Sequence, residues 1–116
     1  MRTRIKFFLY GILFLTCSQS ALSQSDPFQP KVNTWIAKDF VFHTGEHLAE
    51  LKLAYTTLGD PRNPAVLVLH GTAGSAKKML LPTFGGELFK ASGVLDASRF
   101  FIILPDDIGA GNSSKT

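Results

Sequence analysis

The stretch AVLVLHGTAG, residues 65–74, decides the fold of this chain. Its first half is a continuous run of β-branched and aliphatic residues between Pro64 and Gly71. Such a run is typical of a strand that is buried on both faces in a parallel sheet. A buried helix is the alternative, but the run is short for a helix and turn residues flank it. We therefore predict a strand at residues 65–69 that leads into a glycine-rich loop.

A second run of the same kind follows at residues 100–104, FFIIL, and leads into another glycine-containing loop. The residues between the two runs include Pro82 and the pair Gly85-Gly86, so we expect only a short helix, at residues 87–91. Two buried strands joined by helical material indicate a right-handed βαβ unit in a parallel sheet.

The residues before this unit have the rhythm of an antiparallel hairpin. Phe40 and Phe42 alternate with Val41, and further along Leu51, Leu53 and Tyr55 alternate with Lys52, Ala54 and Thr56. Thr44-Gly45-Glu46 forms the turn between the two segments. Residues 24–39 contain prolines and polar side chains and are interpreted as an extended lead-in. The expected fold class is α/β, with an antiparallel hairpin leading into parallel strands over residues 40–116.

Residues 1–23 have the order of a cleaved export signal. Basic residues come first, an apolar run follows at 7–16, and Ala21 and Ser23 then have the spacing of a cleavage site. A bilayer span needs about 20 apolar residues, which disfavours an uncleaved anchor. We expect a secreted or periplasmic protein that has no membrane span after cleavage.

The export signal also changes what the charge implies. The whole chain has 12 Lys and Arg against 9 Asp and Glu, but Arg2, Arg4 and Lys6 lie in the signal. The remainder is balanced and has no basic surface for nucleic acid. Cys17, the single cysteine, also lies in the export signal, and Thr16 directly before it disfavours a lipoprotein signal. We therefore expect no disulfide, no metal site and no organic cofactor.

We compare three explanations for the sequence His-Gly-x-x-Gly after a buried strand. A phosphate-binding P-loop needs glycine before its lysine and Ser or Thr after it, whereas Ala76 and Lys78 flank Lys77. The spacing of Gly71 and Gly74 also fails the dinucleotide pattern. A plain glycine turn is the second explanation, since short motifs match by chance. The third is an oxyanion hole, whose backbone N–H groups point at a developing negative charge from about 2.7–3.1 Å.

We assign the oxyanion role to this glycine loop. The Thr72 N–H is the expected donor, and the Ala73 N–H is the alternative. Gly71 and Gly74 support the loop, because glycine lets the backbone approach a ligand without a Cβ clash. His70 is a candidate general base, but we interpret it as loop support, because a histidine at a strand end more commonly bonds locally.

The loop after the second apolar run, residues 107–114, is predicted to form the rim of the same site. Ser113 and Ser114 do not lie in the G-x-S-x-G sequence of a nucleophile elbow. Asp106 and Asp107 are interpreted as turn formers. No nucleophile is therefore assigned within this sequence.

Taken together, residues 40–116 resemble the amino-terminal part of the α/β-hydrolase fold, and more narrowly its homoserine O-acetyltransferase-like branch. The resemblance depends on the order of four segments: the hairpin, the His-Gly loop, GGELFKASGVLDASRFF, and PDDIGAGNSS. It implies a larger, mostly parallel sheet with a Ser-Asp-His triad at its carboxyl edge, and a small-molecule ester or acyl substrate. Acetyltransferases of this branch have a different residue at the position of Gly71, which favours a hydrolase.

Of the functional positions in that family, only the oxyanion loop with Thr72 matches this chain. We expect the nucleophile, acid and base beyond residue 116, because such a domain takes roughly 200–250 residues. The expected function is that of an amino-terminal fragment of an exported serine hydrolase or acyltransferase, inactive by itself. The alternative is a small secreted binding module without catalysis, which would fold alone.

Overall fold

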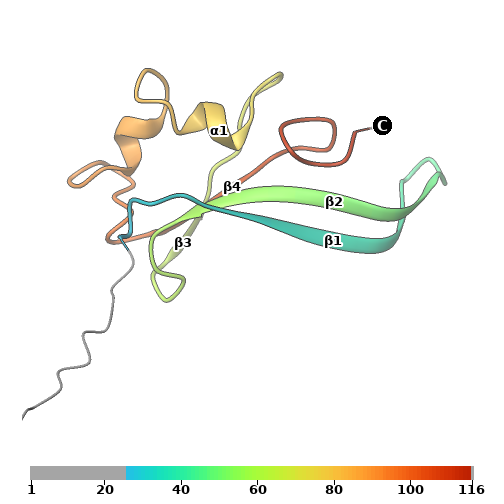
Figure 1. Cartoon of the computed structure of the whole chain (residues 1–116), viewed down its shortest axis with the longest axis horizontal. Coiled ribbons are helices and arrows are strands. Elements are labelled where there is room, and N and C mark those ends of the chain that lie inside the picture. Colours follow the sequence, from blue (N-terminus) through green and yellow to red (C-terminus); the bar gives the residue numbers. More distant parts are fainter. Residues whose placement is uncertain (1–25, 116) are drawn as a thin grey trace, which may run out of the picture.

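The computed structural model describes residues 26–115, and the predicted export signal at residues 1–23, with Cys17, lies outside them. Four strands form one mixed sheet in the order β1-β2-β4-β3 (Figure 1). The strands are β1 (Lys31–Val41), β2 (His47–Leu58), β3 (Ala65–Leu67) and β4 (Phe101–Pro105). Two short helices lie between β3 and β4: α1 (Ala76–Met79) and the 3-10 helix Gly86–Phe89.

β1 and β2 form the predicted antiparallel hairpin and pair along almost their whole length. The turn also lies where predicted: the Gly45 amide donates to the Phe42 carbonyl at 2.9 Å, and Gly45 has a φ of +90°. β1 begins at Lys31, so residues 31–39, which were assigned to the extended lead-in, belong to the hairpin. Their polar side chains are accommodated because β1 is an edge strand and is exposed along most of its length.

β3 and β4 are parallel, as the two apolar runs predicted, and both helices lie in the connection between them. β4 also pairs antiparallel with β2, which attaches the parallel pair to the hairpin. The short helix predicted at residues 87–91 is present as the 3-10 helix Gly86–Phe89. The helix ends at Phe89, and the backbone of Lys90 is already extended, with a φ of −70° and a ψ of 166°.

One face of the sheet carries the core. Both helices lie on the same side of β2 and β4, as the yellow and orange ribbons in Figure 1 show. On this face Ile102 and Leu104 of β4 have no exposed surface, and full burial of such a side chain stabilises the fold by about 1.5–3 kcal/mol. The core cluster consists of Leu58, Ala76, Phe89, Ala97, Ile102 and Leu104.

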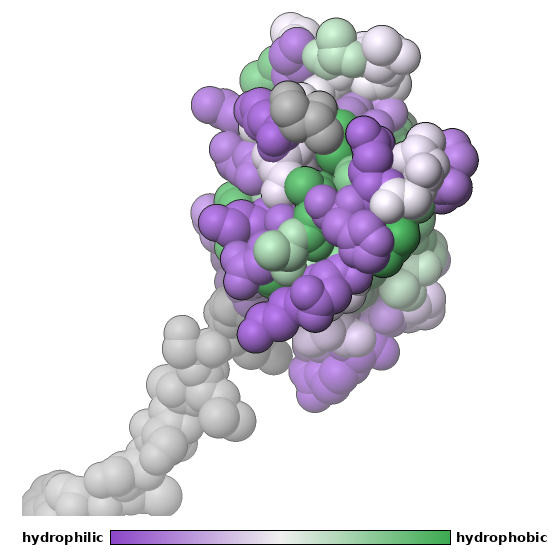
Figure 2. Space-filling view, turned by 90° about the vertical axis from the view of Figure 1, so that its right-hand side faces the viewer, coloured by the Kyte–Doolittle hydropathy of each residue, from purple (hydrophilic) through white to green (hydrophobic). Residues whose placement is uncertain are grey.

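The opposite face is largely open, and here the prediction that residues 65–69 are buried on both faces is wrong. Leu67 is 62% exposed and Trp35 is 56% exposed. The register pairs Leu67 with Ile103 and Trp35 with Leu53, and paired residues share a face. Figure 2 looks at the molecule from the hairpin end and shows apolar residues at the surface between polar ones. Residues 26–115 thus cover one side of this apolar strand and leave the other to solvent.

Candidate active site

The glycine loop after β3 is a four-residue turn from Gly71 to Gly74. The Gly74 amide donates to the Gly71 carbonyl at 2.9 Å. Ala73, at the third position, has a φ of +58°, where a type II turn ordinarily has glycine. None of the described residues accepts a hydrogen bond from the Thr72 or Ala73 amide. Within the described chain the turn therefore presents two unpartnered amides, and its backbone is strained at Ala73.

Helix α1 anchors the end of this turn. The Ser75 hydroxyl caps the helix by accepting a hydrogen bond from the Lys78 amide at 3.2 Å. The Lys78 ammonium then reaches back and donates to the Ala73 carbonyl at 2.9 Å. The strained residue is thus held by a charged donor from the helix that follows it.

His70 supports the turn from its other side, and its side chain is only 2% exposed. Its Nδ1 lies 2.8 Å from the Gly71 carbonyl oxygen, and its Nε2 accepts the Asp107 amide at 3.2 Å. Because Nε2 accepts, the ring proton lies on Nδ1 and is donated to the Gly71 carbonyl. Both ring nitrogens bond backbone groups, so in this arrangement the ring supports the loop.

Asp106, which the sequence indicated only as a turn former, joins the two loops. Its buried carboxylate accepts the Ala76 amide at 2.7 Å and the Asn112 amide at 2.9 Å. Gly111 packs directly against this carboxylate, where any Cβ would overlap it. The available sequence signal was an aspartate directly after a buried strand, followed by glycines. Its partner Ala76 is 30 residues away, and only the fold brings the two together.

The two serines of the last loop have structural partners. The buried Ser113 hydroxyl accepts the Ala54 amide at 2.9 Å and donates to the Asp106 carbonyl at 2.8 Å. The Ser114 hydroxyl accepts the Lys52 amide at 2.9 Å. These bonds attach the loop to β2, so both hydroxyls are engaged in the fold and neither is positioned as a nucleophile.

An open cleft of about 850 Å³ lies between the two loops. Residues 70–75 and Lys78 form one wall, and residues 107–111, part of the predicted rim loop, form the other. A second hollow of about 390 Å³ shares the turn and continues toward Met79 and Phe84. The first cleft lies at the carboxyl ends of both β3 and β4, where open α/β sheets bind their ligands. The unpartnered amides of the turn thus border a space that can hold a substrate.

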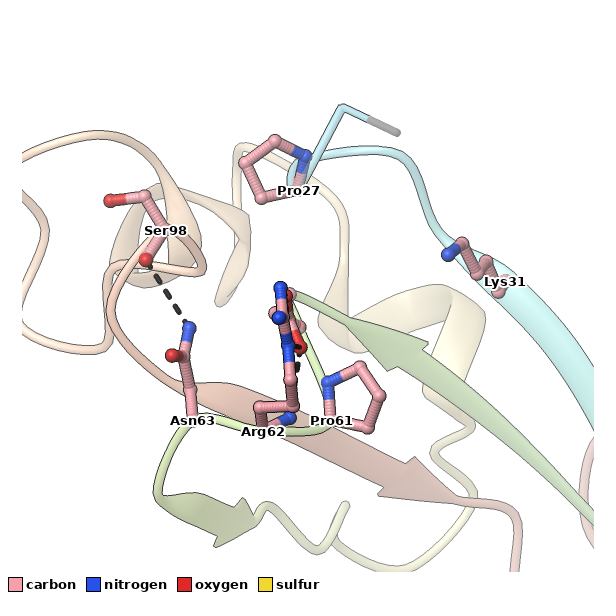
Figure 3. Close-up of a pocket in the computed structure, with 8 residues that line it drawn as sticks. Pro27, Lys31, Pro61, Arg62, Asn63 and Ser98 are labelled. Atoms are coloured by element: carbon pink, nitrogen blue, oxygen red, sulfur yellow. Dashed lines mark hydrogen bonds and ion pairs between the residues drawn. The ribbon is translucent and has the colours of Figure 1, made fainter. Parts of the chain in front are cut away.

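A different hollow, of about 360 Å³, lies at the amino ends of β3 and β4 (Figure 3). Here the Arg62 guanidinium donates three side-chain hydrogen bonds to the Asp60 carboxylate, at 3.0, 3.1 and 2.6 Å. Hydrogen bonds from the Arg62 side chain and amide lower the pKa of Asp60 to about 2. The Asn63 side chain donates to the Ser98 carbonyl at 3.3 Å. These polar groups are paired with one another, and the amino ends of the parallel strands lie here, so we do not assign the site to this hollow.

His43 and His47 flank the hairpin turn and are exposed. Within residues 26–115, no three His, Cys, Asp or Glu side chains lie close enough together to hold a metal ion. The part of the chain that the structure describes also has no helix of sufficient length and apolarity to cross a bilayer.

No family model matches this chain, and no curated protein matches it in sequence. Among solved structures, homoserine O-acetyltransferase from Staphylococcus aureus matches with a TM-score of 0.64 and 22% identity, over 76% of this chain and 28% of that one. Esterase E22 matches with a TM-score of 0.59 and 16% identity, over 76% of this chain and 28% of its own. The chain therefore spans about 28% of the length of each match.

These matches confirm the predicted resemblance at the level of the fold. In this chain the fold consists of the antiparallel hairpin and the parallel pair, joined in the order β1-β2-β4-β3. The loops of the candidate site lie at the carboxyl ends of that pair. The chain therefore has part of an α/β-hydrolase fold.

Proposed function

We propose that this chain is the amino-terminal part of an exported serine-type hydrolase, which cleaves an ester or transfers its acyl group. The observation that carries the proposal is the turn Gly71–Gly74, which has two unpartnered amides beside a cleft at the carboxyl ends of β3 and β4. Attack on an acyl carbonyl places negative charge on its oxygen, and amides fixed in advance stabilise that charge. The Thr72 amide is the proposed donor, with the Ala73 amide as the alternative.

The nucleophile and the proton carrier of this reaction come from residues beyond 116 in the proposed enzyme. Ser113, Ser114 and His70 are engaged in structural hydrogen bonds, which leaves them unsuited to the task. A downstream serine attacks the ester carbonyl while a histidine takes its proton, and the resulting oxyanion lies against the turn. The fold shared with an esterase and an acetyltransferase supports this reaction class. Gly71 favours the hydrolase, and the order of residues 1–23 supports export.

The first test uses the product of the complete reading frame, isolated after export. We expect it to hydrolyse p-nitrophenyl acetate and to react with a fluorophosphonate probe at a serine downstream of residue 116. A protein that does neither would overturn the proposal. Cooperative unfolding of residues 24–116 as an isolated monomer would instead support a small binding module.

Gly74→Ala tests the oxyanion assignment in the same protein. A Cβ at this position would lie 2.7 Å from the Gly71 carbonyl oxygen and 2.8 Å from His70 Nδ1, so the turn must shift. Loss of one oxyanion donor lowers kcat by about 10²–10³. Gly71→Ala is the matched comparison, because its Cβ meets nothing within 4 Å, and we expect a much smaller decrease. Equal decreases, or unchanged turnover in a folded Gly74→Ala protein, would contradict the assignment.

A further inference from the structure

Lys78 makes a contact with the turn that oxyanion binding by itself does not explain. Its ammonium donates to the carbonyl of Ala73, the residue with the left-handed backbone, at 2.9 Å. An alanine in this conformation persists only where its surroundings hold it. The turn has a single internal backbone bond, from Gly74 to Gly71, so the support must come largely from outside the turn.

The contact belongs to a continuous chain of hydrogen bonds. The Lys78 ammonium binds the Ala73 carbonyl, and the amide of the same peptide group, on Gly74, binds the Gly71 carbonyl. That carbonyl also accepts from His70, whose Nε2 in turn holds the loop after β4. Hydrogen bonds in such a chain polarise and strengthen one another. The turn is thus clamped from both flanks, by Lys78 on one side and by His70 on the other.

We propose that Lys78 is a positioning residue that keeps the strained turn closed, so that the Thr72 and Ala73 amides keep their place beside the cleft. This rests on the proposed function only in so far as those amides bind an oxyanion. A second role for Lys78 would be direct attraction between its charge and the oxyanion, because Lys78 also lines the cleft. The two roles differ in one respect: a clamp is needed only while Ala73 is strained.

The test compares kcat on p-nitrophenyl acetate among variants of the complete protein. We expect Lys78→Met to lower kcat by about ten-fold with little change in KM. The substrate still binds, but the amides of the loosened turn form weaker hydrogen bonds to the oxyanion. Lys78→Arg keeps a charged donor and should restore most of the loss. Lys77→Met is the matched control, since Lys77 is exposed on the same helix and has no hydrogen bond to the turn among the described residues.

The decisive measurement is a double-mutant cycle with Ala73→Gly. Glycine adopts the left-handed conformation without strain, so the turn should stay closed without its clamp. In the Ala73→Gly protein we therefore expect Lys78→Met to lower kcat by no more than about two-fold. An equal loss with and without Ala73→Gly would overturn the clamp and assign Lys78 a direct charge effect.

Amide hydrogen exchange provides a readout that does not require turnover. We expect Lys78→Met to speed exchange at the Gly74 amide, and Ala73→Gly to restore the protection. Unchanged exchange at Gly74 in Lys78→Met would overturn the proposal. If the unmodified protein has no esterase activity while exchange responds as expected, the hydrolase function fails and the clamp stands.

Discussion

The amino ends of the parallel strands β3 and β4 form one edge of the molecule, the amino edge, and their carboxyl ends form the other, the carboxyl edge. The two edges use aspartates in opposite ways. At the amino edge, Asp60 and Asp96 accept hydrogen bonds from amides no more than four residues away, so each closes its own turn. At the carboxyl edge, Asp106 accepts the amide of Ala76, 30 residues away, and joins two separate loops. The turn Gly71–Gly74 belongs to the first of these loops and keeps two amides without a partner among the described residues.

This difference separates a closed edge from an open one. Backbone groups that are satisfied locally leave nothing for a ligand to bind. Where loops are instead fixed by side chains from elsewhere in the fold, some of their backbone amides stay available to bind a ligand. Such loops on a rigid scaffold commonly carry function. The contrast predicts that substitution of the aspartate at the carboxyl edge acts through long-range contacts, whereas substitution of the aspartates at the amino edge acts locally.

The largest effect on stability is expected for Asp106→Ala. The substitution removes two bonds to a buried carboxylate and leaves the Ala76 and Asn112 amides unpaired, so we expect the free energy of unfolding to fall by about 3 kcal/mol. Urea denaturation of the complete protein measures it. The neighbouring Asp107→Ala is the control: its side chain is 63% exposed and lies 3.9 Å from His70 Nε2, beyond hydrogen-bond distance. Similar losses in both variants would contradict the difference between the edges.

A smaller, pH-dependent effect is expected for Asp96→Asn. Hydrogen bonds from the Ser98 hydroxyl and from the Ser92 and Ser98 amides hold the pKa of Asp96 below its ordinary value. Such a carboxylate adds stability above its unfolded pKa, and that stability is lost as the pH falls through the folded pKa. We expect Asp96→Asn to lower Tm at neutral pH, with the difference closing below about pH 4. Thermal scans across that range test this, and a difference independent of pH would argue against it.

The smallest effect is expected for Asp60→Asn. The pKa of Asp60 is lowered to about 2 by hydrogen bonds from Arg62, but the Arg62 side chain is 88% exposed and only two residues away. The pair can form in the unfolded chain as well, and exposed pairs contribute little to stability. We expect Tm to be unchanged within error. A decrease as large as that of Asp96→Asn would show that the amino edge also depends on this pair.

Much of the fold was predictable because its signals are local. The alternation of β2, the glycine of the hairpin turn and the two apolar runs each follow from residues adjacent in sequence, and the structure places strands and turn accordingly. Residues 31–39 were assigned to a lead-in because of their polar side chains. They form a strand because β1 lies at the edge of the sheet, where polar side chains are tolerated, and that position depends on the whole sheet. The burial of β3 was overestimated for a similar reason: periodicity shows that a strand is apolar but not which element covers each face.

The candidate site divides in the same way. The residue pattern alone determined that a glycine turn follows an apolar strand, because a strand's composition and a turn's glycines are properties of neighbouring residues. Only the tertiary structure decided that Asp106 joins the turn to the opposite loop, that Ser113 holds β2 and that Lys78 clamps a strained Ala73. These roles depend on the directions of side chains and on partners that the sheet brings together from distant parts of the chain. Neither can be inferred from residues that are adjacent in sequence.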